Sequence, residues 1–372
     1  MPIKDPIDAT LEAADAPAPD SDKKPDSPPK LNGASRKYAL KRALKEFGSD
    51  GGTDLAAMLT YYTVLSLAPA LLAIFSIITL VLANNAETVT ALVEDLVTQY
   101  VPADYQALVV NLVQTMTSSA SGGVIALIIG IATALWSSSA YVKAFSRCMN
   151  TIYGVEEGRG FVKQVVSMLL VTLVLLLGVV LILVSLALNE SLVTGLLGPL
   201  AEPLGLTDML QFLTQTFLPI WTWVKWPIIL ALVVAMIAVL YYFTPIVKQP
   251  KFTWVSIGAV VAIVGIGLAS VALYIYFSFF AGYSSYGAIG TVMALLFALW
   301  IFNIVLLLGA EIDAEMERAR QLQAGIQAEE MIQLPPRSTD KVEKAREARD
   351  QLEADGRVLR LTYGGESDEK TK

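Results

Sequence analysis

Two sets of polar side chains stand at the ends of long apolar runs, where charge is costly and therefore informative. Lys143, Arg147 and Asn150 are spaced i, i+4 and i+7, so a helix places them on one face. Glu311 and Glu315 are spaced i, i+4 at the end of another run. Facing each other at one depth, the two sets predict ion pairing between helices. Two interpretations stay open: cations that only anchor a helix end, or a polar cluster that gates a pathway or holds an anionic head group.

A third polar group lies in the first apolar run. Tyr61, Tyr62 and Ser66 precede Pro69 by one to two helical turns. Proline removes a backbone hydrogen bond inside a helix and should bend it. A bend beside hydroxyl groups either borders a cavity or is a simple packing kink, and both interpretations remain open.

Several kinds of catalytic chemistry are excluded by composition. The chain has no histidine and a single cysteine, Cys148. A Ser-His-Asp triad, a Cys-His pair, a His-ligated metal and an internal disulfide are therefore impossible. Ser139 and Lys143 are spaced i, i+4, as a histidine-free hydrolase would need, but helical spacing produces such pairs often by accident. We expect no catalytic residues, no metal site and no cofactor.

The elements that position these groups are long apolar helices. The chain of 372 residues is 55% apolar, more than a soluble domain of this size needs. A helix needs about 20 apolar residues to cross a bilayer. The stretches that meet this requirement predict an all-α polytopic membrane protein with six transmembrane helices, at 55–83, 122–142, 162–188, 222–242, 252–280 and 287–312.

Basic residues alternate between the connections and predict the orientation. The loops 84–121, 189–221 and 281–286 contain no Lys or Arg, and Lys225 lies among tryptophans at the outer interface. Because basic residues concentrate on the cytoplasmic side, both termini are expected in the cytoplasm of a bacterial inner membrane. The basic residues of the predicted cytoplasmic side are Arg36, Lys37, Lys41, Arg42, Lys45, Lys143, Arg147, Arg159, Lys163, Lys248, Lys251, Arg318 and Arg320.

Two outer connections show helical periodicity. Apolar residues recur at helical spacing over 89–97, 105–116 and 209–217, between spans 1 and 2 and between spans 3 and 4. These segments predict amphipathic helices on the outer face. They either lie on the surface, cap a cavity as a lid, or pack on the spans.

The tails differ from the membrane domain in composition. Residues 1–35 are rich in Pro, Asp and Ala and predict a disordered cytoplasmic tail, followed by a basic juxtamembrane segment at 36–54. The six-helix domain occupies 55–315. The charged cytoplasmic tail 316–372 is expected to be partly helical, with a break at Pro335 and Pro336 and a solvated or disordered stretch near 340–353.

The segments 56–72, 135–164, 241–254 and 286–318 resemble the YihY/BrkB family of bacterial inner-membrane proteins, over the whole region from 54 to 318. Tyr153 stands where the family often has Trp, and Asp313 where it often has Asn. Some relatives have carried the label ribonuclease BN. The positions that match the family are Tyr61, Tyr62, Ser66, Pro69, Trp136, Ser137, Arg147, Asn150, Tyr153, Gly154, Tyr286, Gly287, Gly290, Gly309, Glu311 and Glu315.

The resemblance implies location and topology more than activity. We expect a protein that binds or transports an amphipathic, anionic envelope component such as a lipid, using the polar residues named above. The alternative is a scaffold or assembly factor without transport. Expected partners are membrane lipids, with a homo-oligomer or envelope proteins also open. A nucleic-acid partner and ribonuclease activity are not expected, because histidine, clustered carboxylates and a basic aromatic groove are lacking.

Overall fold

The computed structural model describes residues 5–20, 31–81, 97–98, 106, 110, 123–190, 193–194, 205–250, 256–280 and 287–363. Most of these residues are helical. The helices are α1 (Pro6–Ala13), α2 (Gly33–Ser49), α3 (Gly52–Val81), α6 (Gly123–Ile152), α7 (Phe161–Ala187), α9 (Thr207–Phe212), the π-helical turn η3 (Leu213–Phe217), α10 (Leu218–Phe243), α11 (Ile257–Phe280), α12 (Gly287–Gln323) and α13 (Asp340–Tyr363).

Within the described residues, each predicted apolar stretch overlaps a helix. Within the described residues, four helical stretches have the length and composition to cross a membrane: Phe161–Ala187, Thr207–Phe243, Ile257–Tyr276 and Val292–Gln323. Two further helices, α3 and α6, have 30 residues each and occupy the first two predicted stretches. At a rise of 1.5 Å per residue, each is about 45 Å long, enough to exceed a bilayer core.

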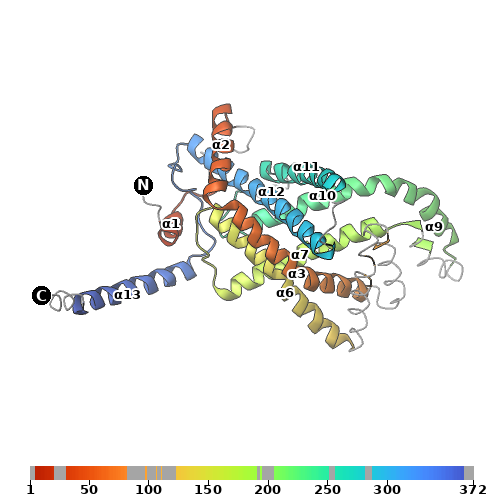
Figure 1. Ribbon diagram of the computed structural model, residues 1–372, viewed down its shortest axis with the longest axis horizontal. Coiled ribbons are helices and arrows are strands. Elements are labelled where there is room, and N and C mark those ends of the chain that lie inside the picture. The colour runs from red at the N-terminus through yellow and green to blue at the C-terminus, as the bar shows by residue number, and fades with distance from the viewer. Residues whose placement is uncertain are drawn as a thin grey trace.

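The long helices pack as pairs around a shared core. Helix α3 runs along α6, α11 along α12, and α10 against α7, while α2 and α3 both contact α12 (Figure 1). Phe145 of α6 stacks on Tyr241 of α10 with ring centroids 6.2 Å apart. Many apolar side chains on the outer sides of these helices are exposed, among them Trp223, Leu268 and Met293. Exposed apolar surface on this scale is what lipid contact requires.

Close contact between α11 and α12 depends on two glycines. A Cβ on Gly258 would overlap the carbonyl oxygen of Gly309, and a Cβ on Gly309 would lie 2.6 Å from the carbonyl oxygen of Gly258. Asp313 of α12 accepts a hydrogen bond of 2.7 Å from the Gly258 amide, in the first turn of α11. Small residues let helices approach closely where hydrophobicity does not drive association. The pair therefore fixes the register of the two helices.

The chain after α12 returns across the end of the bundle that also carries the termini (Figure 1). Val247 and Pro336 form an isolated antiparallel bridge, and the Lys248 amide donates to the Pro335 carbonyl at 2.8 Å. Ile332 and Leu334 are buried in the main core. The predicted break at Pro335 and Pro336 thus falls in an ordered connection, residues 324–339, between α12 and α13.

Both tails contain a helix, α1 in the N-terminal tail and α13 in the C-terminal tail. Within the segment expected to be disordered, Asp5 caps α1 by accepting from the Ile7 amide at 2.8 Å. Arg349 of α13 forms an ion pair with Asp5 at 2.7 Å, so the two tails contact each other. Helix α13 projects from the bundle, and only Val342 of its residues is buried (Figure 1).

The predicted outer helices are tested only in part. The segments 89–97 and 105–116 lie outside the described residues, apart from 97, 106 and 110. The segment 209–217 is helical, as α9 and η3, and has no buried residue. It continues directly into α10 instead of forming a separate surface helix, because the helical hydrogen bonding passes through the π turn without a break.

Candidate functional site

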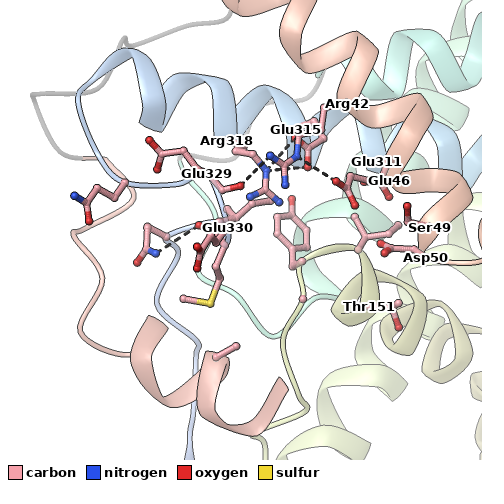
Figure 2. Close-up of a pocket in the computed structure, with 18 of the residues that line it drawn as sticks. Arg42, Glu46, Ser49, Asp50, Thr151, Glu311, Glu315, Arg318, Glu329 and Glu330 are labelled. Atoms are coloured by element: carbon pink, nitrogen blue, oxygen red, sulfur yellow. Dashed lines mark hydrogen bonds and ion pairs between the residues drawn. The ribbon is translucent and has the colours of Figure 1, made fainter. Parts of the chain in front are cut away.

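A cavity of about 820 Å³ lies where α1, α2, α12, the end of α6 and the connection 324–339 meet. Two arginines, Arg42 and Arg318, line it together with a larger number of acidic side chains (Figure 2). We call it the acidic cavity. Its carboxylates belong to Glu12, Glu46, Asp50, Glu311, Glu315, Glu329 and Glu330.

Two helices bring most of these groups together. Glu311, Glu315 and Arg318 occupy successive turns of α12, and helical spacing keeps them on one side. Helix α2 packs against α12, and Arg42, Glu46 and the C-cap residue Asp50 follow one another at intervals of four residues, so they also share one side. The sequence predicted the acidic pair on α12. It did not predict that α2 provides the opposite wall.

Glu315 has two arginine partners. Arg318 donates to its two carboxylate oxygens at 2.9 and 3.0 Å, and Arg42 approaches it at 3.4 Å. Arg42 also lies 3.4 Å from Glu46. Arg318 donates further to the Ala328 carbonyl at 2.8 Å. The positive charge in the cavity is therefore concentrated around Glu315 and the neighbouring Glu46.

Glu311 has a different environment, although it lies only one turn away. Its residue surface is 1% exposed, and neither carboxylate oxygen has a hydrogen-bond partner among the described residues. The charges that act on it most strongly are those of Asp50, Glu315 and Glu46, all of them negative. A buried carboxylate without a partner is costly, so this position calls for a bound cation or proton.

Asp50 closes α2 at the edge of the cavity. Partial burial raises the pKa of Asp50 to about 6, and the negative charges of Glu46 and Glu315 act in the same direction. The positive charge of Arg318 opposes them but does not outweigh them. The neighbourhood of Asp50 is therefore negative overall, in agreement with the count of charged groups.

The cations predicted to pair with the α12 acids lie elsewhere. The Arg147 guanidinium lies 5.2 Å from the ring centre of Tyr62 on α3, and the Lys143 ammonium lies 4.4 Å from the ring centre of Trp136. Tyr61 and Tyr62 contact edge to face. We call these five residues of α3 and α6 the basic aromatic face. Tyr61 is 63% and Trp136 49% exposed, so the face lies on the outside of the bundle.

The expected ion pairing between Lys143 or Arg147 and the α12 acids is not found. Within the described residues neither cation lies within 4.0 Å of a carboxylate, whereas Glu315 pairs with Arg42 and Arg318. The physical reason is rotation about the helix axis. Residues at one depth on two neighbouring helices meet only if both faces turn inward, and the basic face of α6 turns outward.

Asn150 does not belong to the basic aromatic face with Lys143 and Arg147, and it links parts of the backbone instead. It is buried, its side-chain carbonyl accepts from the Ile246 amide at 2.9 Å, and its side-chain amide donates to Glu157 at 3.2 Å. Glu157 in turn binds Arg159, whose guanidinium also donates to the Thr244 carbonyl at 2.9 Å. Asn150 thus joins α6 to the segment that follows α10 and, through Glu157, to the loop between α6 and α7.

The remaining predicted residues lie on α3. Ser66 is buried, and its hydroxyl has no partner among the described residues. Pro69 lies inside the helix, as predicted. Nearby, Asn303 of α12 donates to the Thr60 hydroxyl at 3.2 Å and accepts from the Tyr141 hydroxyl at 3.1 Å. This polar contact joins α3, α6 and α12. The isolated Asn303 in an apolar run was its one signal in the sequence.

Fold and site together define a helical membrane protein with several apolar helices and a cluster of charged groups at one end of the bundle. The chain belongs to the family described as Virulence factor BrkB, whose model matches residues 43–332. It is also 28% identical over 285 residues to the "Putative ribonuclease-like protein YfkH" of Bacillus subtilis (strain 168), which covers 76% of this chain and 96% of the relative. No solved structure matches the chain. The family resemblance read from the sequence motifs is therefore confirmed.

Proposed function

We propose that this protein is a six-span bacterial inner-membrane protein, with both termini in the cytoplasm, that binds or moves an anionic amphipathic envelope component such as a lipid. The basic aromatic face is the proposed contact. The alternating distribution of Lys and Arg supports the orientation. The lengths of α3 and α6 support two spans beyond the four found by composition.

The observation that carries the proposal is the environment of the Lys143 and Arg147 charges. Both lie over aromatic rings on the outside of the bundle, and no described carboxylate neutralises them. Cation–π contact holds such groups in place without cancelling their charge. Each basic group near an anionic leaflet contributes about 1 kcal/mol to attraction. An anionic head group meets two preorganised cations there, beside exposed apolar residues for its chains.

Reconstituted liposomes test this proposal. Transbilayer movement of labelled phosphatidylglycerol should be faster with the protein than without it, and a variant with Lys143→Gln and Arg147→Gln should lose most of that increase. Lys225→Gln is the matched control, because its ammonium also lies over a tryptophan, Trp226, at 5.6 Å, near the other end of the bundle. Unchanged rates for the main envelope lipids would count against transport.

A non-transporting scaffold is the second candidate, and α13 is the observation that favours it. This helix projects from the bundle with nearly all its side chains exposed. A scaffold predicts that Arg147→Ala lowers protein abundance without changing activity per molecule. Transport predicts lost activity at normal abundance.

The name of the Bacillus relative does not lead us to propose ribonuclease activity. The chain has no histidine, and the described residues contain no group of three or more metal-binding side chains with suitable geometry. A metal-dependent nuclease needs such a group. We propose that the protein is not an enzyme.

A further inference from the structure

The acidic cavity contains a carboxylate that the protein leaves unsatisfied. Glu311 lines the cavity, is 1% exposed, and has no hydrogen-bond partner for either oxygen among the described residues. The arginines nearest to it are engaged by Glu315 and Glu46. A buried carboxylate of this kind is stabilised by a cationic ligand that enters the cavity.

Further carboxylates line the cavity beside Glu311. Asp50 is the strongest of the negative charges acting on it, and Glu46 lies one turn before Asp50 on α2. Four residues of helix correspond to about 6 Å along the axis. That separation is similar to the distance between two ammonium groups joined by three or four methylene groups.

The volume and lining of the cavity favour an organic ligand over an inorganic ion. Its volume of about 820 Å³ is far larger than a single ion needs. The described carboxylates do not converge in any group of three or more that could hold a metal. The wall also includes apolar or aromatic side chains, among them Ile152, Tyr153 and Ile332. Separated carboxylates in a partly apolar cavity match a chain of ammonium groups joined by methylenes.

We propose that the acidic cavity binds a linear organic polyamine, with one ammonium group on Glu311 and two further ammonium groups near Asp50 and near Glu46. Each ammonium gains a charge-assisted hydrogen bond, and the methylene chain covers the apolar wall. The site is separate from the basic aromatic face and does not depend on the lipid proposal. It gives the protein a second ligand of opposite charge at the end of the bundle that carries the termini.

Isothermal titration calorimetry of the full chain in a neutral detergent tests the proposal, with the triamine spermidine as probe at constant ionic strength. We expect spermidine to bind more tightly than n-butylamine or Mg²⁺. Loss of a charged hydrogen-bond partner should weaken binding about tenfold or more in Glu311→Gln. Asp50→Asn, at a half-buried position, should weaken it in the same direction and serves as a second variant if Glu311→Gln is poorly folded.

Glu347→Gln is the matched control, because this carboxylate is exposed on α13, away from the cavity. It should leave spermidine affinity unchanged. Equal affinity of the wild type and both cavity variants, or equal affinity for spermidine and n-butylamine, would overturn the proposal. So would tighter binding of Mg²⁺, which would identify the cavity as an inorganic cation site, or the absence of any spermidine binding.

Discussion

Replacing Arg159 by alanine should weaken the packing of α6 against the segment that follows α10. The Arg159 guanidinium is buried and donates to both oxygens of Glu157, at 2.8 and 2.7 Å. It also donates to the Ser146 hydroxyl at 3.1 Å and to the Thr244 carbonyl at 2.9 Å. Arg159→Ala removes all four contacts and leaves the Glu157 carboxylate buried beside Asn150 without its cation.

The expected loss follows from burial. Breaking a buried ion pair by removing one partner costs about 3–5 kcal/mol, because the remaining charge stays desolvated. Cys148, the only cysteine of the chain, is buried in α6 between Ser146 and Asn150. Its thiol therefore becomes accessible when α6 separates from its neighbours. If labelling of its thiol follows the open population, the rate with a maleimide should rise roughly 150- to 5,000-fold in detergent.

Two comparisons make this assay specific. Lys163→Ala removes an ion pair with Asp340 in which both side chains are more than half exposed, so labelling should rise less than about fivefold. A double variant, Glu157→Gln with Arg159→Met, removes both charges and should recover part of the loss. If Arg159→Ala labels within a few-fold of wild type, the cluster does not hold α6 in place and our reasoning is wrong.

Two other perturbations test the cavity edge and the helix contact. Asp50→Asn should stabilise the protein by about 1 kcal/mol at pH 7, after discounting for partial exposure. The folded-state pKa of Asp50 is raised to about 6, so its effect on stability is most favourable below the unfolded pKa and is lost as pH rises through 6. The gain from Asp50→Asn, measured by thermal unfolding, should therefore vanish toward pH 4. A gain that does not depend on pH would contradict this origin. Gly258→Ala should destabilise by about 1–3 kcal/mol in the same assay, because the new methyl group meets the Gly309 carbonyl. Gly267→Ala, where no atom lies within 4 Å of the new methyl group, should be neutral or slightly stabilising, and equal losses at both glycines would refute the packing argument.

The helices of the bundle could be predicted because a long apolar run is a local signal. The stretch predicted at 162–188 is α7, Phe161–Ala187, and that at 287–312 begins α12 at Gly287. The spacing of glycines in the sequence does not give the rotation of a helix about its axis. Gly258 and Gly265 face α12, whereas no atom lies within 4 Å of a Cβ placed on Gly267.

The site was less predictable because its partners are distant in sequence. Glu315 pairs with Arg42, which the sequence presents only as one of several basic residues before the first span. Arg159 appeared as a loop cation that marks orientation, whereas it is buried in a polar cluster. Neither partnership leaves a local pattern. The start of α1 did leave a local pattern, because Asp5 precedes Pro6 as a capping residue precedes the first helical position. The prediction of disorder for residues 1–35 followed the composition instead of this pattern.

Native mass spectrometry of the purified protein tests the central claim most directly, because it counts lipids that remain bound. Released from membranes containing equal amounts of phosphatidylglycerol and phosphatidylcholine, the wild type should retain phosphatidylglycerol in preference. The variant with Lys143→Gln and Arg147→Gln should lose that preference, while Lys225→Gln keeps it. Equal retention of phosphatidylglycerol by the wild type and the double variant would show that the basic aromatic face does not hold an anionic head group.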